Sequence, residues 1–168
     1  MHRLGYGYKQ TTSVPCQADA AAQSAFLADT LAPLLAQAEA GTATVYFADA
    51  AHPTHDTRAT HVWTRKGDKR PWLTVSGRER VNLNAALNAV VPTQVHLDET
   101  VCVDARSARR LYEQLLAAHP EGPLYVVCDN ARYYKNKGLA AWLAAKRLVQ
   151  VFLPPYSPNL NLIERLWK

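Results

Sequence analysis

The chain alternates between segments whose apolar residues recur at helical spacing and short runs of β-branched and aromatic residues. The first segment, residues 19–40, is predicted to be a helix that Pro33 kinks and Gly41 ends. The run 44–48 then predicts a strand that ends at Asp49.

Further along, the same patterns predict short strands and then alternating helices and strands. Strands are predicted at 61–64, 71–76, 81–91 and 94–97, and helices at 107–118, 137–146 and 159–168. The all-apolar run 124–128 is typical of a buried central strand, and 148–153 predicts another strand. Because a strand–helix–strand passage needs a right-handed crossover, the predicted fold class is mixed α/β with a parallel portion.

The composition is that of one ordinary globular domain. The chain has 168 residues, of which 48% are hydrophobic and 20% are charged. Its longest apolar runs are far shorter than the roughly 18 residues that a membrane span needs, and no apolar signal core follows Met1. We therefore expect a cytoplasmic protein without a membrane partner. Three cysteines without a CxxC spacing argue against a disulfide framework.

Positive charge is in modest excess and is clustered. The formal net charge is +5, which favours anionic partners such as nucleic acid, although solvated surface charge is an equal alternative. The candidate DNA-binding residues, which would hold phosphates, are Arg65, Lys66, Arg132, Lys135, Lys137 and Arg165.

Two of the predicted strands end in an aspartate, Asp49 and Asp129. In α/β sheets, functional groups gather beyond the carboxyl ends of parallel strands, so these two residues are candidates for one site. A third acid, Glu164, lies in the predicted terminal helix. Taken singly, each aspartate is better explained as a turn former, and Glu164 as a solvent-facing helix residue.

Taken together, three segments resemble a known family. These are Val45-Tyr46-Phe47-Ala48-Asp49, the run Val126 to Ala131 with its Asp-Asn-Ala, and the Pro-Pro-Tyr-Ser-Pro segment that leads through Asn161 to Glu164 and Trp167. They resemble the DDE transposases of the mariner superfamily, in its bacterial insertion-sequence branch. The 34 residues between Asp129 and Glu164 are typical of that branch.

The resemblance implies an RNase H-like fold in which Asp49, Asp129 and Glu164 meet as catalytic residues and metal ligands. It implies two Mg²⁺ ions, for which Mn²⁺ can substitute, and Asn130 and Asn161 as supporting residues. Hard divalent cations prefer such oxygen ligands, and a pair of them can activate one oxygen and stabilise another in an in-line displacement. The implied function is DNA cleavage and strand transfer, with transposon ends and target DNA as partners, a homo-oligomer during transposition, and a location at the bacterial nucleoid.

The resemblance also divides the chain and leaves alternatives open. Residues 1–43 are expected to form an arm or linker and a helix, and 44–168 the catalytic domain, truncated at its C-terminal end. Departures from the family pattern stand at Ala85, Tyr134 and Leu162. The chain is expected to represent the catalytic part only, without the helix-turn-helix modules that relatives carry. An inactive remnant that binds DNA or a partner, and a stand-alone RNase H-like nuclease, are the competing hypotheses.

Other residues receive structural interpretations. A zinc site at His52, His55 and His61 near Asp56 is a minor alternative, since no second ligand pair accompanies it. The four tryptophans, Trp63, Trp72, Trp142 and Trp167, are expected to be core residues. The remaining nearby acids, Asp98, Glu99 and Asp104, are expected at a strand end and a helix start.

Overall fold

The computed structural model describes residues 19–56, 63, 65–67 and 76–167. Predictions that concern residues 1–18, most of the strands at 61–64 and 71–76, Cys16, Trp72 and Lys168 lie outside the described residues. Among the helices that the structure describes, none is long and apolar enough to cross a membrane.

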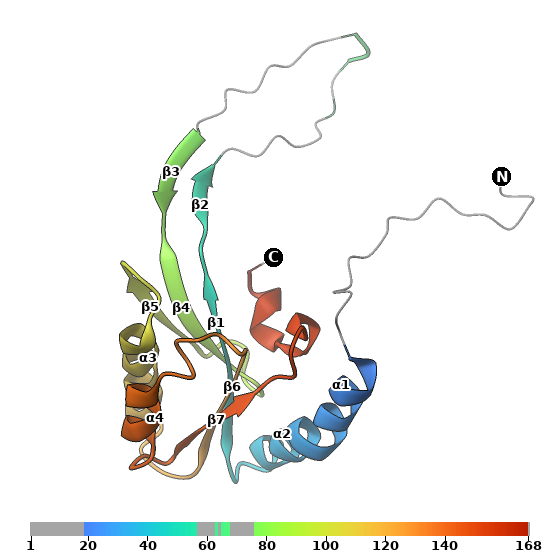
Figure 1. The fold of residues 1–168 in the computed structure, drawn as a ribbon. Helices are drawn as coiled ribbons and strands as arrows, with labels where there is room; N and C mark the ends of the chain where they lie inside the picture. The colour runs from blue at the N-terminus through green and yellow to red at the C-terminus, as the bar shows by residue number, and fades with distance from the viewer. Residues whose placement is uncertain (1–18, 57–62, 64, 68–75, 168) are drawn as a thin grey trace, which may run out of the picture.

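A mixed five-stranded sheet forms the centre of the fold, with strand order β5-β4-β1-β6-β7 (Figure 1). Its strands are β1 (Thr44–Ala51), β4 (Asn82–Asn88), β5 (Val95–Thr100), β6 (Leu124–Cys128) and β7 (Leu148–Phe152). The first three pair antiparallel, whereas β6 and β7 run parallel to β1. This is the RNase H-like arrangement, and the predicted mixed α/β class is confirmed.

One face of the sheet is covered by α3 (Ala105–Ala118) and α4 (Lys137–Leu143). Helix α3 begins at Asp104, whose carboxylate accepts hydrogen bonds from the backbone N–H groups of Arg106 and Ser107, and the Ser107 hydroxyl closes the capping box. Its buried side chains, including Leu111 and Tyr112, pack on the β1 and β6 residues of the same face. The predicted helix start at Asp104 is confirmed.

The opposite face is covered by α1 (Ala20–Phe26), η2 (Leu27–Leu31) and α2 (Ala32–Glu39). The expected irregularity is present, but it precedes Pro33 as the π-helical turn η2. Proline has no N–H for the preceding turn and its ring crowds the carbonyl four residues back, so the distortion falls on that turn. Leu31 and Leu34 are buried against Val45 and Phe47 of the sheet.

A two-stranded hairpin, β2 (Thr54–Asp56) with β3 (Ser76–Arg80), continues from β1 and β4 away from the main sheet (Figure 1). The predicted single strand over 81–91 is shorter in the structure: Val81 separates β3 from β4, and β4 ends at Asn88, whose side chain accepts from the backbone N–H groups of Val90 and Val91. The predicted strand at 94–97 is present as β5.

The C-terminal segment differs from the prediction. In place of a helix over 159–168, the structure has two short 3₁₀ helices, η3 (Pro158–Leu160) and η4 (Leu162–Arg165). Asn161 interrupts them with an extended backbone, φ −85° and ψ 109°. Its side-chain amide donates to the carbonyl of Ala48 on β1 at 3.2 Å, and this tertiary bond prevents a continuous helix.

Candidate active site

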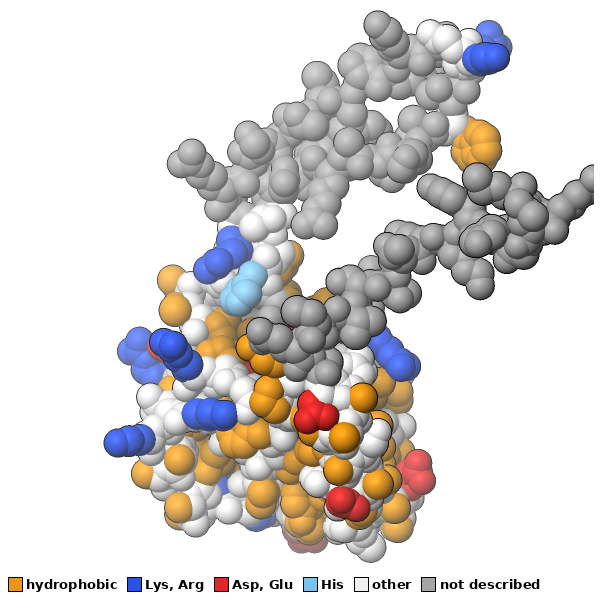
Figure 2. Space-filling model, turned by 45° about the vertical axis from the view of Figure 1, so that its right-hand side comes forward, with side chains coloured by type: hydrophobic (Ala, Val, Ile, Leu, Met, Phe, Trp, Pro, Cys, Tyr) orange, Lys and Arg blue, Asp and Glu red, His pale blue; other side chains and the backbone are white. Residues whose placement is uncertain are grey.

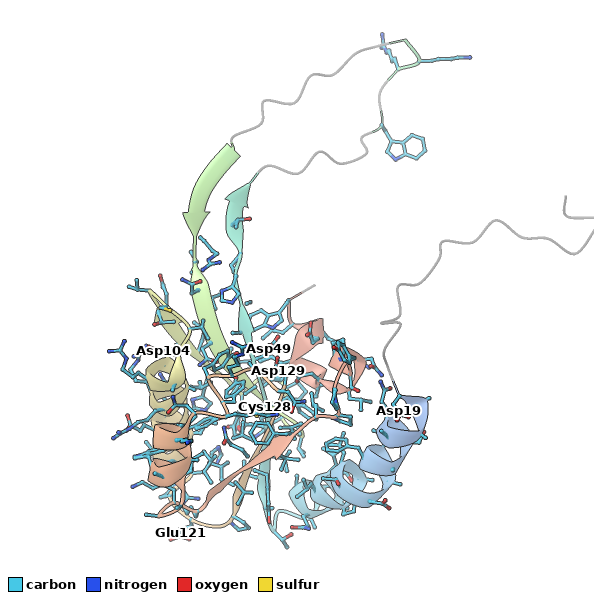
Figure 3. The ribbon with its side chains drawn as sticks, in the orientation of Figure 1. Asp19, Asp49, Asp104, Glu121, Cys128 and Asp129 are labelled. Carbon is cyan, nitrogen blue, oxygen red and sulfur yellow. The ribbon has the colours of Figure 1, made fainter. Side chains whose placement is uncertain are left out.

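Asp49 on β1 and Asp129, which directly follows the neighbouring parallel strand β6, lie at the same end of the sheet (Figure 3). The two strands are paired in register up to Phe47 opposite Val127, and each aspartate lies two residues beyond this pair. One detail of the prediction was wrong: β1 does not end at Asp49 but continues to Ala51, because β4 pairs with it that far.

The turn after β6 holds Asp129 by local hydrogen bonds. The Asp129 carboxylate accepts from the backbone N–H of Ala131 at 3.0 Å. The next residue, Asn130, donates from its side chain to the carbonyl of Leu153 at 2.6 Å, and the Leu153 N–H donates to the carbonyl of Cys128 at 2.9 Å. These bonds join the ends of β6 and β7, so Asn130 positions the backbone beside Asp129.

Glu164 is brought to the same end of the sheet by the terminal segment. Its backbone N–H donates to the carbonyl of Asn161 at 3.2 Å, and Asn161 is itself bonded to β1 next to Asp49. Asn161 is 4% exposed, and its side-chain oxygen has no hydrogen-bond partner among the described residues. Asn161 therefore ties Glu164 to the strand that carries the first acid.

Trp167 is a site residue that the sequence reasoning assigned only to the core. Its indole N–H donates to the Asp49 carboxylate at 3.0 Å, while its ring packs on the sheet with Ile163. Its spacing of three residues from Glu164 is the signal that could have placed the two on one side of a helical turn.

The electrostatics agree with this convergence. Burial raises the pKa of Asp49 from 3.8 to about 6; the negative charges of Glu164 and Asp129 also raise it, while hydrogen bonds from the Ala50 backbone and from Trp167 lower it. Tyr133 feels the same acids: burial first, then the charges of Asp129 and Asp49, raise the pKa of its hydroxyl. Asp49 thus lies in a field of uncompensated negative charge.

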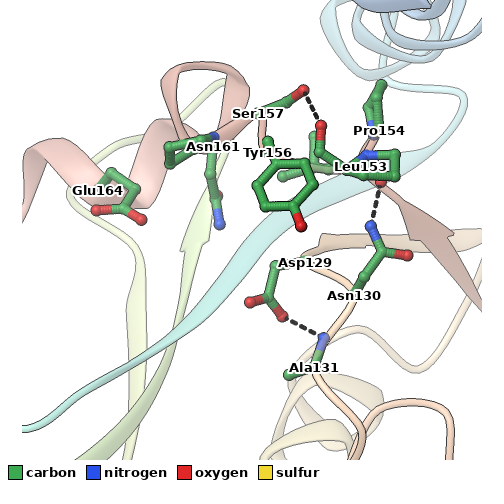
Figure 4. Close-up of a pocket in the computed structure, with 11 residues that line it drawn as sticks. Asp129, Asn130, Ala131, Leu153, Pro154, Tyr156, Ser157, Asn161 and Glu164 are labelled. Atoms are coloured by element: carbon green, nitrogen blue, oxygen red, sulfur yellow. Dashed lines mark hydrogen bonds between the residues drawn. The ribbon is translucent and has the colours of Figure 1, made fainter. Parts of the chain in front are cut away.

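Asp129 and Glu164 also line one open cavity of about 490 Å³ (Figure 4). The segment from Leu153 to Pro158 forms much of its wall. Within that wall Tyr156 has a φ of 56°, a left-handed conformation that costs a bulky residue about 1–3 kcal/mol. The Ser157 hydroxyl donates to the carbonyl of Pro155 at 3.1 Å and stabilises the turn.

The chemistry of this donor set fits a hard divalent cation. Among the described residues, no cationic side chain is bonded to any of the three carboxylates. The pKa of Asp49 is raised mainly by burial, and the charges of Glu164 and Asp129 add to that effect. The acids are not drawn together into a closed cage: no group of three or more His, Cys, Asp or Glu side chains in the described ranges is spaced to hold a metal ion.

The candidate DNA-binding residues do not form one patch. All six are exposed, and Figure 2 shows basic side chains dispersed over the visible face. Arg65 and Lys66 lie in the connection between β2 and β3, whereas Arg132, Lys135 and Lys137 follow Asp129. The Lys135 ammonium lies 5.3 Å from the centre of the Phe152 ring. Arg165 directly follows Glu164 in η4.

The structure tests some of the minor predictions and leaves the zinc alternative untested. The His52 Nδ1 is hydrogen-bonded to the side-chain oxygen of Asn82 at 2.8 Å. His61 and the side chains of His55 and Asp56, the other residues of the zinc alternative, lie outside the described residues. Asp98 forms an ion pair with Arg110 at 2.8 Å. The core assignment of Trp63 was wrong, because its side chain is fully exposed.

A family described as "DDE superfamily endonuclease" matches residues 44–168 of this chain. Among curated proteins, no sequence matches. Several solved structures share the fold at low sequence identity. The Mos1 transposase paired-end complex with left transposon end is 16% identical, with a TM-score of 0.68 over 98% of this chain and 52% of that chain.

Two further structures extend the comparison. The Mos1 Strand Transfer Complex is 14% identical, with a TM-score of 0.68 over 99% of this chain and 52% of that chain. The simian T-cell lymphotropic virus intasome in complex with PP2A regulatory subunit B56 gamma is 12% identical, with a TM-score of 0.51 over 73% of this chain and 36% of that chain. The chain thus spans about half the length of the transposase chains it matches.

Proposed function

Since the chain belongs to the DDE superfamily endonucleases, we propose that it cleaves DNA strands and joins a freed 3′ end to a second strand, as in transposition of an insertion sequence. The observation that carries this proposal is the convergence of three carboxylates from separate segments, with Asp49 and Asp129 on paired parallel strands and Glu164 tied to the first by Asn161.

In this proposal Asp49, Asp129 and Glu164 are the metal ligands. Mg²⁺ is the expected ion and Mn²⁺ its substitute; bound there, they supply charge neutralisation at a phosphate and activation of an attacking oxygen. The chain's own contribution is orientation. Asn130 and the Ala131 N–H hold the turn of Asp129, and Trp167 holds one oxygen of Asp49.

The proposed partner is DNA, both transposon ends and target. The transposase structures that share this fold are named as complexes with a transposon end and as a strand transfer complex. The exposed cations Arg132, Lys135 and Lys137, which follow Asp129 along the chain, suit contacts to phosphates. Contacts to phosphates carry no sequence information, so binding by this chain is expected to be weak, nonselective and strongly salt-dependent. A homo-oligomer during transposition, a bacterial insertion-sequence origin and a nucleoid location belong to the same proposal.

The open arrangement of the acids favours one competing function, a remnant that binds DNA without cutting it. The test is nicking of a supercoiled plasmid with Mg²⁺ or Mn²⁺, beside calorimetric titration of Mn²⁺ into the chain. We expect metal uptake and nicking, both lost in Asp129→Asn. Uptake without nicking, or neither, would support the remnant instead. Preference for RNA–DNA hybrids over duplex DNA would support a stand-alone nuclease.

A further inference from the structure

Tyr156 has a left-handed backbone conformation, which is unusual for a tyrosine. Its φ of 56° is unfavourable for a residue with a bulky side chain, and glycine or asparagine would hold the same turn with less strain. Strained backbone of this kind is retained at sites where it positions a side chain for function.

The side chain that this strain positions is presented to solvent. Tyr156 is 57% exposed, whereas the neighbouring Leu153 and Ser157 are 4% exposed each. The turn is rigid, since Pro154, Pro155 and Pro158 fix their φ angles. The loop is thus anchored on both sides and displays one aromatic ring, so little conformational entropy is lost when a ligand meets it.

The ring belongs to the cavity that Asp129 and Glu164 line. Figure 4 shows the Tyr156 hydroxyl pointing toward Asp129, with Asn161 and Glu164 to the left of the ring. If the acids hold a scissile phosphate, the base of an adjoining nucleotide is the part of DNA that reaches this ring. Aromatic rings stack on any base, but in an intact duplex the base faces are already covered.

We propose that Tyr156 forms a stacking subsite for an unpaired nucleobase next to the scissile phosphate. This subsite rests on the proposed function for its biological role, although binding can be measured without cutting. It makes the chain prefer DNA whose end is frayed or single-stranded over a closed duplex. Because stacking tolerates every base, the preference is for unpaired structure and not for a sequence.

The test uses the 168-residue chain in metal-free buffer at low salt and two fluorescent probes. One is a duplex with a three-nucleotide overhang containing 2-aminopurine; the other carries 2-aminopurine within a blunt duplex. We expect the wild type to quench the overhang probe. Tyr156→Gly should bind the overhang about tenfold more weakly, with its affinity for the blunt duplex unchanged. Tyr156→Trp should retain both the quenching and the affinity.

Two controls separate stacking from loop damage. Tyr156→Gly relieves the left-handed backbone, so its melting temperature should not fall below that of the wild type. Val149→Ala removes another exposed apolar side chain, on β7 and outside the cavity lining, and should bind both probes as the wild type does. Equal binding of the overhang by wild type and Tyr156→Gly, or equal losses on both probes, would overturn the subsite.

The failure of the subsite and that of the proposed function are distinguishable. If the wild type nicks plasmid DNA but Tyr156→Gly keeps full overhang affinity, the subsite is wrong and the function stands. If the wild type quenches the overhang probe in a Tyr156-dependent way but never nicks, the subsite stands and the catalytic function is wrong.

Discussion

The central strands β1 and β6 and the C-terminal segment position their acids in different ways. Asp49 lies on β1 and Asp129 directly follows β6, and the parallel pairing of these two strands, which ends at Phe47 and Val127, sets the relative position of the two aspartates. Glu164 is carried by a short 3₁₀ turn whose connection to the sheet consists of Ile163 packing and the bonds of Asn161 and Trp167. Two ligands are therefore built into the sheet, and the third depends on a few side chains.

This difference gives the two strand-borne acids and Glu164 different roles when a ligand binds. A metal ion or phosphate meets two carboxylates placed by the paired strands, while the third lies on a short 3₁₀ turn that is joined to the sheet by side chains. Substitutions on the sheet side should abolish the chemistry and leave the fold intact. Substitutions on the terminal side should weaken both the chemistry and the local structure.

The largest effect is expected for Asp129→Asn. It keeps the size of the side chain and its acceptor for the Ala131 N–H but removes the charge that balances a cation. Plasmid nicking with Mg²⁺ should fall by about 10³-fold or more, with an unchanged circular dichroism spectrum. Asp98→Asn, which breaks the partly buried ion pair with Arg110, is the matched control and should nick normally. Undiminished nicking by Asp129→Asn would assign the ligand role to another residue.

The second prediction breaks the connection of the terminal segment. Asn161→Ala removes the bond to the Ala48 carbonyl and leaves that acceptor buried, at a cost of about 1–3 kcal/mol in the free energy of unfolding. Nicking should fall because Glu164 loses its position, and high Mn²⁺ should restore part of it. Urea denaturation and metal-dependent rates measure both effects.

Asn159→Ala is the control for this variant, because the Asn159 side chain is exposed and, among the described residues, hydrogen-bonds only to the side chain of Gln23. It should change the free energy of unfolding by less than about 0.5 kcal/mol. If Asn161→Ala proves equally mild, the apolar packing of the terminal segment and the bond of Trp167 to Asp49 hold it without Asn161.

A third prediction concerns the charge on the sheet side. Because the folded-state pKa of Asp49 is raised to about 6 from 3.8, the folded state binds this proton more tightly than the unfolded state does. The metal-free chain therefore loses stability as pH rises from about 4 to 6. Asp49→Asn should be more stable than the wild type by about 1–2 kcal/mol above pH 7, and no more stable at pH 4. Thermal melts across this pH range, without metal, measure the difference.

Added Mn²⁺ should reverse that order, since it stabilises only a chain that binds it. The wild type should gain in melting temperature and Asp49→Asn should not. If the difference in stability between the wild type and Asp49→Asn is the same at pH 4 and pH 7.5, burial of the Asp49 charge does not destabilise the fold.

The smallest effect is expected for Trp167→Phe, which keeps most of the aromatic packing and removes the indole donor to Asp49. The hydrogen bond lowers the pKa of Asp49, so its loss should raise that pKa further. The melting temperature of the metal-free chain should then fall more steeply as the pH rises. Mn²⁺ affinity should fall by less than about tenfold. Trp142→Phe, whose ring instead lies under Arg109 and Lys146, should leave Mn²⁺ affinity unchanged.

The sequence determined the acids and the strands that carry two of them. A short apolar run followed by an aspartate is a local pattern, and the parallel crossover follows from the order of the elements. The strands before Asp49 and Asp129, and the position of both residues at the same end of the sheet, could therefore be predicted. The capping box at Asp104 was equally local, because its bonds join residues within one helical turn.

The tertiary structure decided the features that depend on contacts between distant segments. The bond of Asn161 to Ala48 spans 113 residues and replaces a predicted helix by two 3₁₀ turns, and the bond of Trp167 to Asp49 spans 118 residues. The left-handed backbone of Tyr156 is likewise unfavourable by local preference and is retained within an anchored loop. Local propensity depends on residues that are neighbours in the chain, whereas these three features are stabilised by packing and hydrogen bonds that exist only once the sheet has formed.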